Sequence, residues 1–199
     1  MADQIILPLA IYLPAHCREI DSIVNIPRMK RFYHISDNPR IKIFEPRAPM
    51  ASQYRMLPDV VFAITGELLH NYLLPRDCPR VTYYIGPQTS AADRQYFFGH
   101  STATYIVAVE AAWLKRIQQA IIYCYEFPPD NFYLLDQCAG YYISEKTVAP
   151  LQVKPIYNVM DEMLKRNVEL RFMPSIISLA SAVKDSSLNF SLIRMLYAR

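Results

Sequence analysis

Glycine is scarce in this sequence, with four residues among 199. The phosphate-binding loops of P-loop and dinucleotide-binding proteins need several glycines close together, because the backbone must approach the phosphates. No such loop occurs, and the chain also lacks the HExxH motif of zinc proteases and the GxSxG turn of serine hydrolases. These absences exclude the common enzyme classes that those motifs define.

A basic cluster is missing as well. The chain has 21 basic and 18 acidic side chains, a net charge of +3, and no run of lysine and arginine concentrates this charge. Proteins that bind nucleic acid neutralise several phosphates with a basic stripe or patch. We therefore expect no stable nucleic-acid binding, whereas a small anionic ligand is compatible with this composition.

Closely spaced cysteines are also absent. Cys17, Cys78, Cys124 and Cys138 are scattered along the chain and form no CxxC pair. Zinc sites and disulfide-rich secreted domains both depend on short cysteine spacings. The pattern predicts no metal site and indicates reduced thiols in a cytoplasmic protein.

The sequence has no hydrophobic run long enough to span a bilayer. The apolar stretch Ile5–Leu13 contains Pro8 and follows Asp3, so it lacks both the length of a membrane helix and the basic start of a signal peptide. We expect no membrane insertion. Residues 1–28 differ in character from the rest, and we interpret them as an N-terminal extension of a single domain over residues 29–199.

That domain contains a succession of short strand and helix patterns. Alternating or apolar runs bounded by turn residues are typical of strands, and apolar residues three or four apart are typical of helices. The patterns predict strands over Arg31–Ser36, Val60–Thr65, Val81–Ile85, Tyr105–Val109, Ile121–Phe127, Phe132–Leu135, Tyr141–Ser144 and Val168–Phe172. They predict helices over Glu67–Leu73, Ser90–Phe98, Ala111–Ala120, Ile156–Arg166 and Ser175–Asp185, with Leu188–Leu196 as a further candidate. We expect an α+β fold with a mixed or antiparallel central sheet and flanking helices.

The leucines near the C-terminus are relevant to the oligomeric state. Leu188, Leu192 and Leu196 recur at helical spacing. An exposed leucine face would indicate a homodimer, whereas packing onto the domain's own sheet would leave a monomer. The sequence leaves both alternatives open.

The polar groups best suited to chemistry lie in two stretches. His34 and Ser36 share one face of the first strand, because side chains alternate along a strand. The turn Pro75–Arg80 contains two arginines and two prolines, and the prolines fix φ and reduce the entropy lost on ordering. Arg76 is therefore suited to bind a carboxylate or phosphate. The alternative is a structural ion pair between Asp77 and either arginine of the turn.

Four segments together resemble a bacterial protein family of unknown function. They are FYHISDNPRIKIFEPR (32–47), VVFAITGELLHNYLLPRDCPRVTYY (60–84), YEFPPDNFYLLDQCAGYYIS (125–144) and LNFSLIRM (188–195). The resemblance extends over residues 29–199, and PRDCPR followed by AGYYIS is its most specific part. It implies family membership and brings no established activity.

A more remote resemblance is to the ADP-ribosyltransferase-like superfamily, which includes the RNA 2′-phosphotransferases and several toxins. FYHIS (32–36) is similar to their early strand, LYHGT, and VFAIT (61–65) followed by Tyr72 is similar to their next strand and helix. The resemblance implies an ADP-ribosyltransferase-like fold with NAD as the cofactor. His34 would then hydrogen-bond the ribose of NAD. Thr65 or Tyr72 would flank the nicotinamide, and Arg76 would meet the pyrophosphate.

Those transferases place a glutamate at the head of a late strand, where it orients the ribose and stabilises oxocarbenium charge. The corresponding strand here is AGYYIS (139–144), and Glu145 follows at its far end. Three alternatives remain. Glu145 or Glu126 acts from a shifted position, or His34 and arginine carry a phosphotransferase-like reaction, or the protein binds a nucleotide without turning it over.

The sequence therefore supports two alternative functions. The first is a nucleotide or phosphate-ligand site at His34 and Arg76, with His34 and Glu145 as catalytic candidates. The further ligand-binding candidates are Ser36, Thr65, Tyr72 and Tyr141. The second is a non-catalytic binding or interaction protein in which His34 and Arg76 are structural. One pocket that contains both side chains would favour the first.

Overall fold

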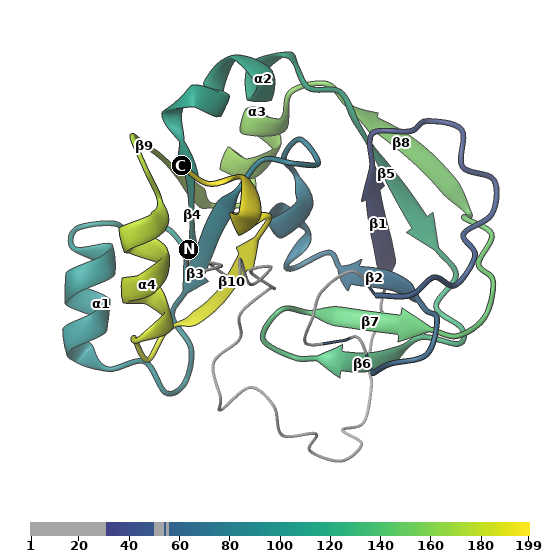
Figure 1. Ribbon diagram of the computed structural model, residues 1–199, viewed down its shortest axis with the longest axis horizontal. Coiled ribbons are helices and arrows are strands. Elements are labelled where there is room, and N and C mark those ends of the chain that lie inside the picture. The colour runs from purple at the N-terminus through teal and green to yellow at the C-terminus, as the bar shows by residue number, and fades with distance from the viewer. Residues whose placement is uncertain (1–30, 50–53, 55) are drawn as a thin grey trace, which may run out of the picture.

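Two β-sheets lie side by side and share a core at the centre of the protein (Figure 1). The computed structural model describes residues 31–49, 54 and 56–199. Buried residues of both sheets, among them Ile64 and Tyr141 of one and Val107 and Val109 of the other, belong to the same apolar cluster. The described residues form a single α+β domain.

The larger sheet has six strands in the order β6-β7-β2-β1-β5-β8, all paired antiparallel. Its strands are β1 (Phe32–Ser36), β2 (Val61–Thr65), β5 (Ile122–Phe127), β6 (Tyr133–Asp136), β7 (Tyr141–Ser144) and β8 (Gln152–Ile156). A second apolar cluster, which includes Phe32, Phe44 and Phe127, lies against this sheet.

The smaller sheet has four strands in the order β10-β3-β4-β9. They are β3 (Arg80–Tyr84), β4 (Tyr105–Glu110), β9 (Val168–Met173) and β10 (Asn189–Ile193). The pair β4 and β9 runs parallel, and the other two pairs run antiparallel, so this sheet is mixed.

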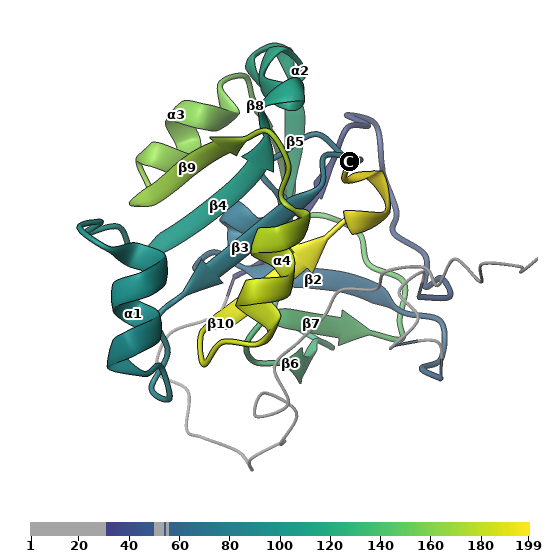
Figure 2. The same cartoon turned by 60° about the vertical axis from the view of Figure 1, so that its left-hand side comes forward.

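Helices cover the smaller sheet. The helices α1 (Ala91–Phe98) and α4 (Ile177–Lys184) pack side by side on one of its faces (Figure 2). The helices α2 (Leu114–Gln119) and α3 (Val159–Leu164) lie together at its β9 edge. Three 3₁₀ turns complete the described elements: η3 (Leu69–Tyr72), η4 (Ala111–Trp113) and η5 (Met195–Tyr197).

The residues of β3 alternate between two environments. Val81 and Tyr83 pack beneath α1 and α4. Because side chains alternate along a strand, Arg80, Thr82 and Tyr84 point to the opposite face, toward the larger sheet. This alternation puts polar side chains between the two sheets.

The larger sheet is split between its two central strands. β1 pairs with β5 along its whole length, from Phe32 to Ser36. It pairs with β2 only at Phe32 and Tyr33, after which the two strands diverge. The divergence leaves an opening in the sheet beside His34.

Several sequence predictions need correction. The strands form two sheets and not one central sheet. The sequence could not show this division, because local patterns do not specify which distant strands pair. The candidate helix Leu188–Leu196 is wrong, since β10 occupies this segment and alternates its side chains: Phe190 and Leu192 pack under α4. Leu188 is also buried, so the exposed leucine face that would indicate a homodimer does not form. β8 was missed, since Pro155 conceals this edge strand.

Other predictions concern the cysteines and the chain ends. Cys78 and Cys124 are free thiols, but Cys138 is disulfide-bonded, so the prediction of reduced thiols is wrong for that residue. The proposed N-terminal extension, residues 1–28, lies outside the described residues. Within the described part of the chain, no helix has the length and apolar character needed to cross a membrane.

Candidate functional site

A cavity of about 190 Å³ lies between the two sheets, where β1 and β2 diverge. The larger sheet contributes residues of β1, β2 and β7, and the smaller sheet contributes the start of β3 and the end of β10. The cavity is lined by Tyr33, His34, Ile35, Ser36, Asp37, Phe62, Ala63, Ile64, Tyr72, Leu74, Arg76, Arg80, Tyr141, Ile193 and Arg194. It contains both His34 and Arg76, the arrangement that favours a ligand site.

A hydrogen bond to the backbone of β2 fixes the tautomer of His34. Its Nδ1 lies 3.0 Å from the carbonyl oxygen of Phe62. Because a carbonyl oxygen only accepts, Nδ1 carries the proton and Nε2 remains an acceptor. Burial lowers the pKa of His34, and the nearby Arg76 and Arg47 lower it further. A neutral imidazole with a free Nε2 acceptor therefore lines the cavity.

Arg80 places a buried positive charge in the cavity wall. The residue is 2% exposed. Its Nε donates to the carbonyl of Asn71 and one terminal nitrogen donates to the carbonyl of Cys78, both at 2.9 Å. Its guanidinium carbon lies 5.6 Å from the ring centroid of Tyr72. No described carboxylate forms an ion pair with it, and burial lowers its pKa.

Two further arginines line the cavity. Arg76 is exposed on the turn before β3. Arg194 follows β10 and has a left-handed backbone, with φ of 56°. Neither takes part in an ion pair within the described residues, so the structural pairing of Asp77 with an arginine of the turn is not formed. Non-glycine residues with positive φ are uncommon and are often found at functional sites.

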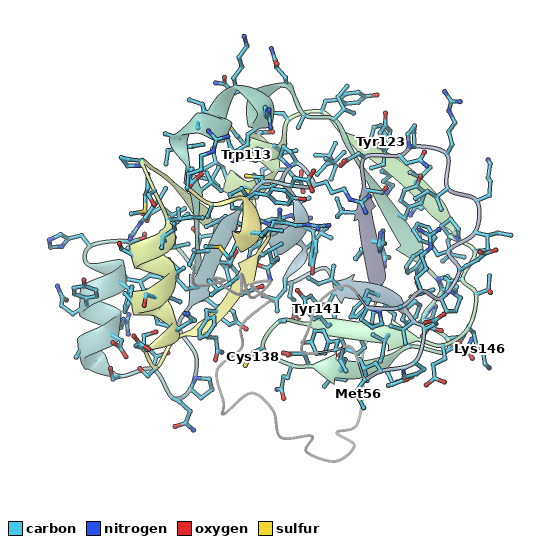
Figure 3. The ribbon with its side chains drawn as sticks, in the orientation of Figure 1. Met56, Trp113, Tyr123, Cys138, Tyr141 and Lys146 are labelled. Carbon is cyan, nitrogen blue, oxygen red and sulfur yellow. The ribbon has the colours of Figure 1, made fainter. Side chains whose placement is uncertain are left out.

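Two tyrosines from different elements meet at the cavity. Tyr72 ends η3 and Tyr141 begins β7, and their hydroxyl oxygens are 2.6 Å apart. Tyr141 lies on the side of the larger sheet that is directed toward the smaller sheet (Figure 3). Gly140 positions it: φ is +69°, and a Cβ here would lie 2.7 Å from a methyl carbon of Leu68. Only glycine fits this turn without strain.

The candidate residues from the sequence fall into two groups. His34, Ser36, Tyr72, Arg76 and Tyr141 all line the cavity. The structure thus brings together residues from three separate stretches of the chain, 34–36, 72–76 and 141.

Thr65 and Glu145 are not among the lining residues. Thr65 pairs with Phe32, on the closed side of the split. Glu145 follows the far end of β7, roughly 13 Å along the strand from Tyr141 at 3.3 Å per residue, where it is exposed and accepts a hydrogen bond from Tyr133. Glu126 also lies outside the lining, ion-paired with Arg31. No glutamate is among the described residues that line the cavity.

Sequence reasoning missed Arg80 and Arg194. Arg80 was considered only as a partner for Asp77, and Arg194 was assigned to a helix. Arg80 begins a strand rich in Val and Tyr, but its inward direction follows from the packing of Val81 under the helices, which the sequence does not show. Arg194 has no local signal either.

The described residues contain no group of three or more histidine, cysteine, aspartate or glutamate side chains that could hold a metal ion. The fold is that of an α+β protein with two sheets, and an arginine-lined cavity lies between them. The chain belongs to a family of unknown function (DUF6886), whose model matches residues 33–198. No curated protein and no solved structure matches the sequence.

Proposed function

We propose that this protein binds a phosphate-bearing ligand, with an NAD-like nucleotide as the first candidate, in the cavity between the sheets. The observation that carries the proposal is Arg80 in a wall of that cavity, a buried guanidinium that has no carboxylate partner among the residues that the structure describes. Burying an unpaired charge costs several kcal/mol. A bound anion would offset this cost.

The other lining residues suit a phosphorylated ligand. The fork of N–H donors on arginine matches phosphate oxygens better than a point charge does. Arg76 and Arg194 add two more such groups. His34 Nε2 supplies an acceptor for a hydroxyl of the same ligand. The site therefore combines anion binding with recognition of an uncharged polar group.

The resemblance to the ADP-ribosyltransferase-like superfamily supports the nucleotide assignment. Three residues implicated by that resemblance, His34, Tyr72 and Arg76, lie around one cavity. We propose on this basis that the domain is a divergent member of that superfamily.

The position of Glu145 favours a second candidate function, nucleotide binding without classical ADP-ribosyl transfer. Glu145 is remote from the cavity, and the acidic residue among the lining residues is the exposed Asp37. A reaction that depends on His34 and the arginines, as in a phosphotransferase, remains compatible with the site.

Calorimetric titration with NAD tests the proposal. We expect saturable binding to the wild-type protein and its loss in the His34→Ala and Arg76→Ala variants. Arg94→Gln, an exposed change on α1 outside the cavity lining, serves as the matched control and should bind normally. Circular dichroism checks that each variant is folded. No binding of NAD or of inorganic phosphate at millimolar concentration would overturn the proposal.

Release of nicotinamide separates the two candidates. A protein that turns NAD over liberates nicotinamide, which chromatography detects, and this release should disappear in His34→Ala. Saturable binding without release over many hours would assign a non-catalytic role. Release that depends on Glu145 and not on His34 would contradict the assignment of the cavity as the reacting site.

A further inference from the structure

The cavity between the sheets has a buried end and an exposed mouth. Four of its lining residues are each 2% exposed and define the buried end: Ile64, Leu74, Arg80 and Tyr141. Two others, Asp37 and Arg76, are exposed and mark the mouth. A ligand that enters past Asp37 and Arg76 therefore meets Arg80 with its leading group.

Arg80 presents one nitrogen atom to this cavity. Its Nε and Nη1 donate to the carbonyl oxygens of Asn71 and Cys78, and Nη1 also lies 3.5 Å from the carbonyl oxygen of Pro75. Nη2 has no hydrogen-bond partner among the described residues, and it is not among the buried polar atoms that lack one. Because Arg80 lines the cavity, Nη2 is open to it. A guanidinium fixed at two of its nitrogens thus directs the N–H donors of the third toward a ligand.

A second arginine comes from the neighbouring strand end. Arg80 is directly opposite Ile193 in the β3–β10 ladder, and Arg194 follows Ile193. Arg194 also lines the cavity. The leading group of a ligand therefore meets Nη2 of Arg80 where the chain also supplies Arg194.

The charge of the lining suits a phosphate monoester. The three arginines of the lining, at positions 76, 80 and 194, outnumber its single acidic residue, Asp37, by two positive charges. None of the three forms an ion pair within the described residues. A phosphate monoester carries about 1.5 to 2 negative charges at pH 7, whereas a phosphodiester carries about one. The monoester balances the excess and the diester does not.

The size of the cavity restricts which part of a ligand is enclosed. Its volume of about 190 Å³ is smaller than the roughly 300–1,000 Å³ of pockets that enclose a whole drug-sized molecule. One end of a nucleotide-sized ligand fits inside, and the remainder lies beyond the mouth. A phosphate at the end of a molecule can reach the buried end, whereas a phosphate with bulky groups on both sides cannot.

We propose that the cavity accepts a terminal phosphate monoester, inserted phosphate-first, which Arg80 and Arg194 hold while His34 Nε2 accepts a hydrogen bond from a hydroxyl of the adjoining sugar. This inference rests on the proposed function and narrows its ligand class. Among NAD-like nucleotides it selects one with a terminal phosphate, as in NADP, over NAD, whose phosphates are both internal.

Calorimetry with two matched pairs of probes tests the inference. NADP and NAD differ in one terminal phosphate, and AMP and 3′,5′-cyclic AMP differ in whether the phosphate is a monoester or a diester. Hydrogen bonds between charged groups are stronger than those between neutral ones. We therefore expect the monoester to bind about tenfold or more tightly in at least one pair.

Variants at the buried end locate the preference. Arg80→Lys keeps the positive charge but removes the fork of donors, and Arg194→Asn keeps a residue that tolerates the left-handed backbone. Each should reduce the preference for the monoester to below about tenfold. Arg94→Gln, the control outside the cavity lining, should leave it unchanged. Melting temperatures check folding, and Arg194→Asn decides the result if Arg80→Lys does not fold.

The outcomes separate this inference from the function on which it rests. Saturable binding with a preference below about tenfold in both pairs would overturn the terminal monoester and leave the phosphate-ligand site standing. A preference that stays at about tenfold or more in the folded variants would also overturn it, because the phosphate would then bind elsewhere. No binding of the four probes or of inorganic phosphate at millimolar concentration would overturn the proposed function as well.

Discussion

Arg80 and Arg171 are both fixed on the smaller sheet, but their surroundings differ. Arg171, on β9, donates to a carboxylate oxygen of Glu169 at 2.7 Å and to the hydroxyl of Tyr83 and the carbonyl of Phe97 at 2.8 and 2.9 Å. Arg80, on β3, is more deeply buried and donates only to backbone carbonyls among the described residues. Glu169 neutralises the charge of Arg171, whereas no described carboxylate neutralises the charge of Arg80.

The difference distinguishes a structural arginine from a candidate binding residue. Arg171 joins β9, β3 and α1 through a complete set of partners, so it needs no ligand. The carbonyls around Arg80 satisfy donors but do not cancel its charge, and guanidinium cannot lose its proton at any ordinary pH. The cavity beside Arg80 is where a counter-ion would lie.

Truncation should affect Arg80 more than Arg171. Arg80→Ala leaves two buried carbonyls without donors, at about 1–3 kcal/mol each, and empties the volume of a buried side chain, at about 2–5 kcal/mol. Removal of the unpaired charge regains several kcal/mol, so we expect a net loss of unfolding free energy of about 3 kcal/mol. The Arg171 side chain is 32% exposed, and Arg171→Ala should cost about 1–2 kcal/mol. Urea denaturation measures both. A greater loss for Arg171→Ala would contradict the comparison.

His70 is also buried, but unlike an arginine it can lose its proton when it is buried. It is completely buried, and burial, with Arg166 nearby, lowers its pKa to about 4 from the ordinary 6.5. The unfolded chain therefore binds more protons between these values, and stability falls as pH drops from about 6.5 to about 4. The loss attributable to this group approaches about 3 kcal/mol, at 1.36 kcal/mol per pKa unit.

Urea denaturation at pH 7 and pH 4.5 measures this effect. The difference between the two pH values should shrink in His70→Phe, which keeps a ring to pack on Tyr105. The exposed His100 provides the control, since His100→Gln should leave the difference unchanged. An unchanged acid response in His70→Phe would show that His70 is not the group responsible.

Inorganic phosphate should stabilise the folded protein by binding in the cavity and not by binding at Arg171. A ligand that binds only the folded state adds about 2.7 kcal/mol at one hundred times its Kd. We expect inorganic phosphate to raise the melting temperature of the wild type and of Arg171→Ala, and to have little effect on Arg194→Asn. Equal stabilisation of all three proteins would mean that phosphate stabilises them without binding in the cavity.

Arg194 should show opposite effects on stability and on binding. Its left-handed backbone costs about 1 kcal/mol or more for a side chain of this kind, and asparagine tolerates this conformation. We therefore expect Arg194→Asn to raise the unfolding free energy by up to about 1 kcal/mol while weakening phosphate binding. A variant that loses both stability and binding would indicate a structural arginine, as at position 171.

Much of the fold could be predicted from local patterns. β1, β2, β4, β5, β7 and β9 lie within about two residues of their predicted bounds, because apolar runs and turn residues mark them directly. Ser90 caps α1 by accepting a hydrogen bond from the backbone N–H of Asp93, and Gly99 ends that helix, so α1 lies within the predicted range Ser90–Phe98. β10 could not be separated from a helix, since its leucine spacing fits both patterns.

The candidate site could be predicted only in part. His34 and Arg76 stood out because of their immediate neighbours, a strand face and a rigid proline turn. Glu145 was placed by analogy with a glutamate at the head of a strand, whereas the direction of β7 carries it away from Tyr141. Arg80 and Arg194 could not be recognised as partners, since only the pairing of β3 with β10 brings them together.

The sequence by itself determined the individual strands and most helices, the glycine turn before Tyr141 and the family, since these depend on residues close together in the chain. Tertiary structure alone decided the division into two sheets, the split beside His34 and the gathering of unpaired arginines around one cavity. The physical reason is that burial and counter-charge are properties of distant segments after they pack. A sequence gives the charge of each arginine, but only the packed structure decides which arginine has no carboxylate partner among the described residues.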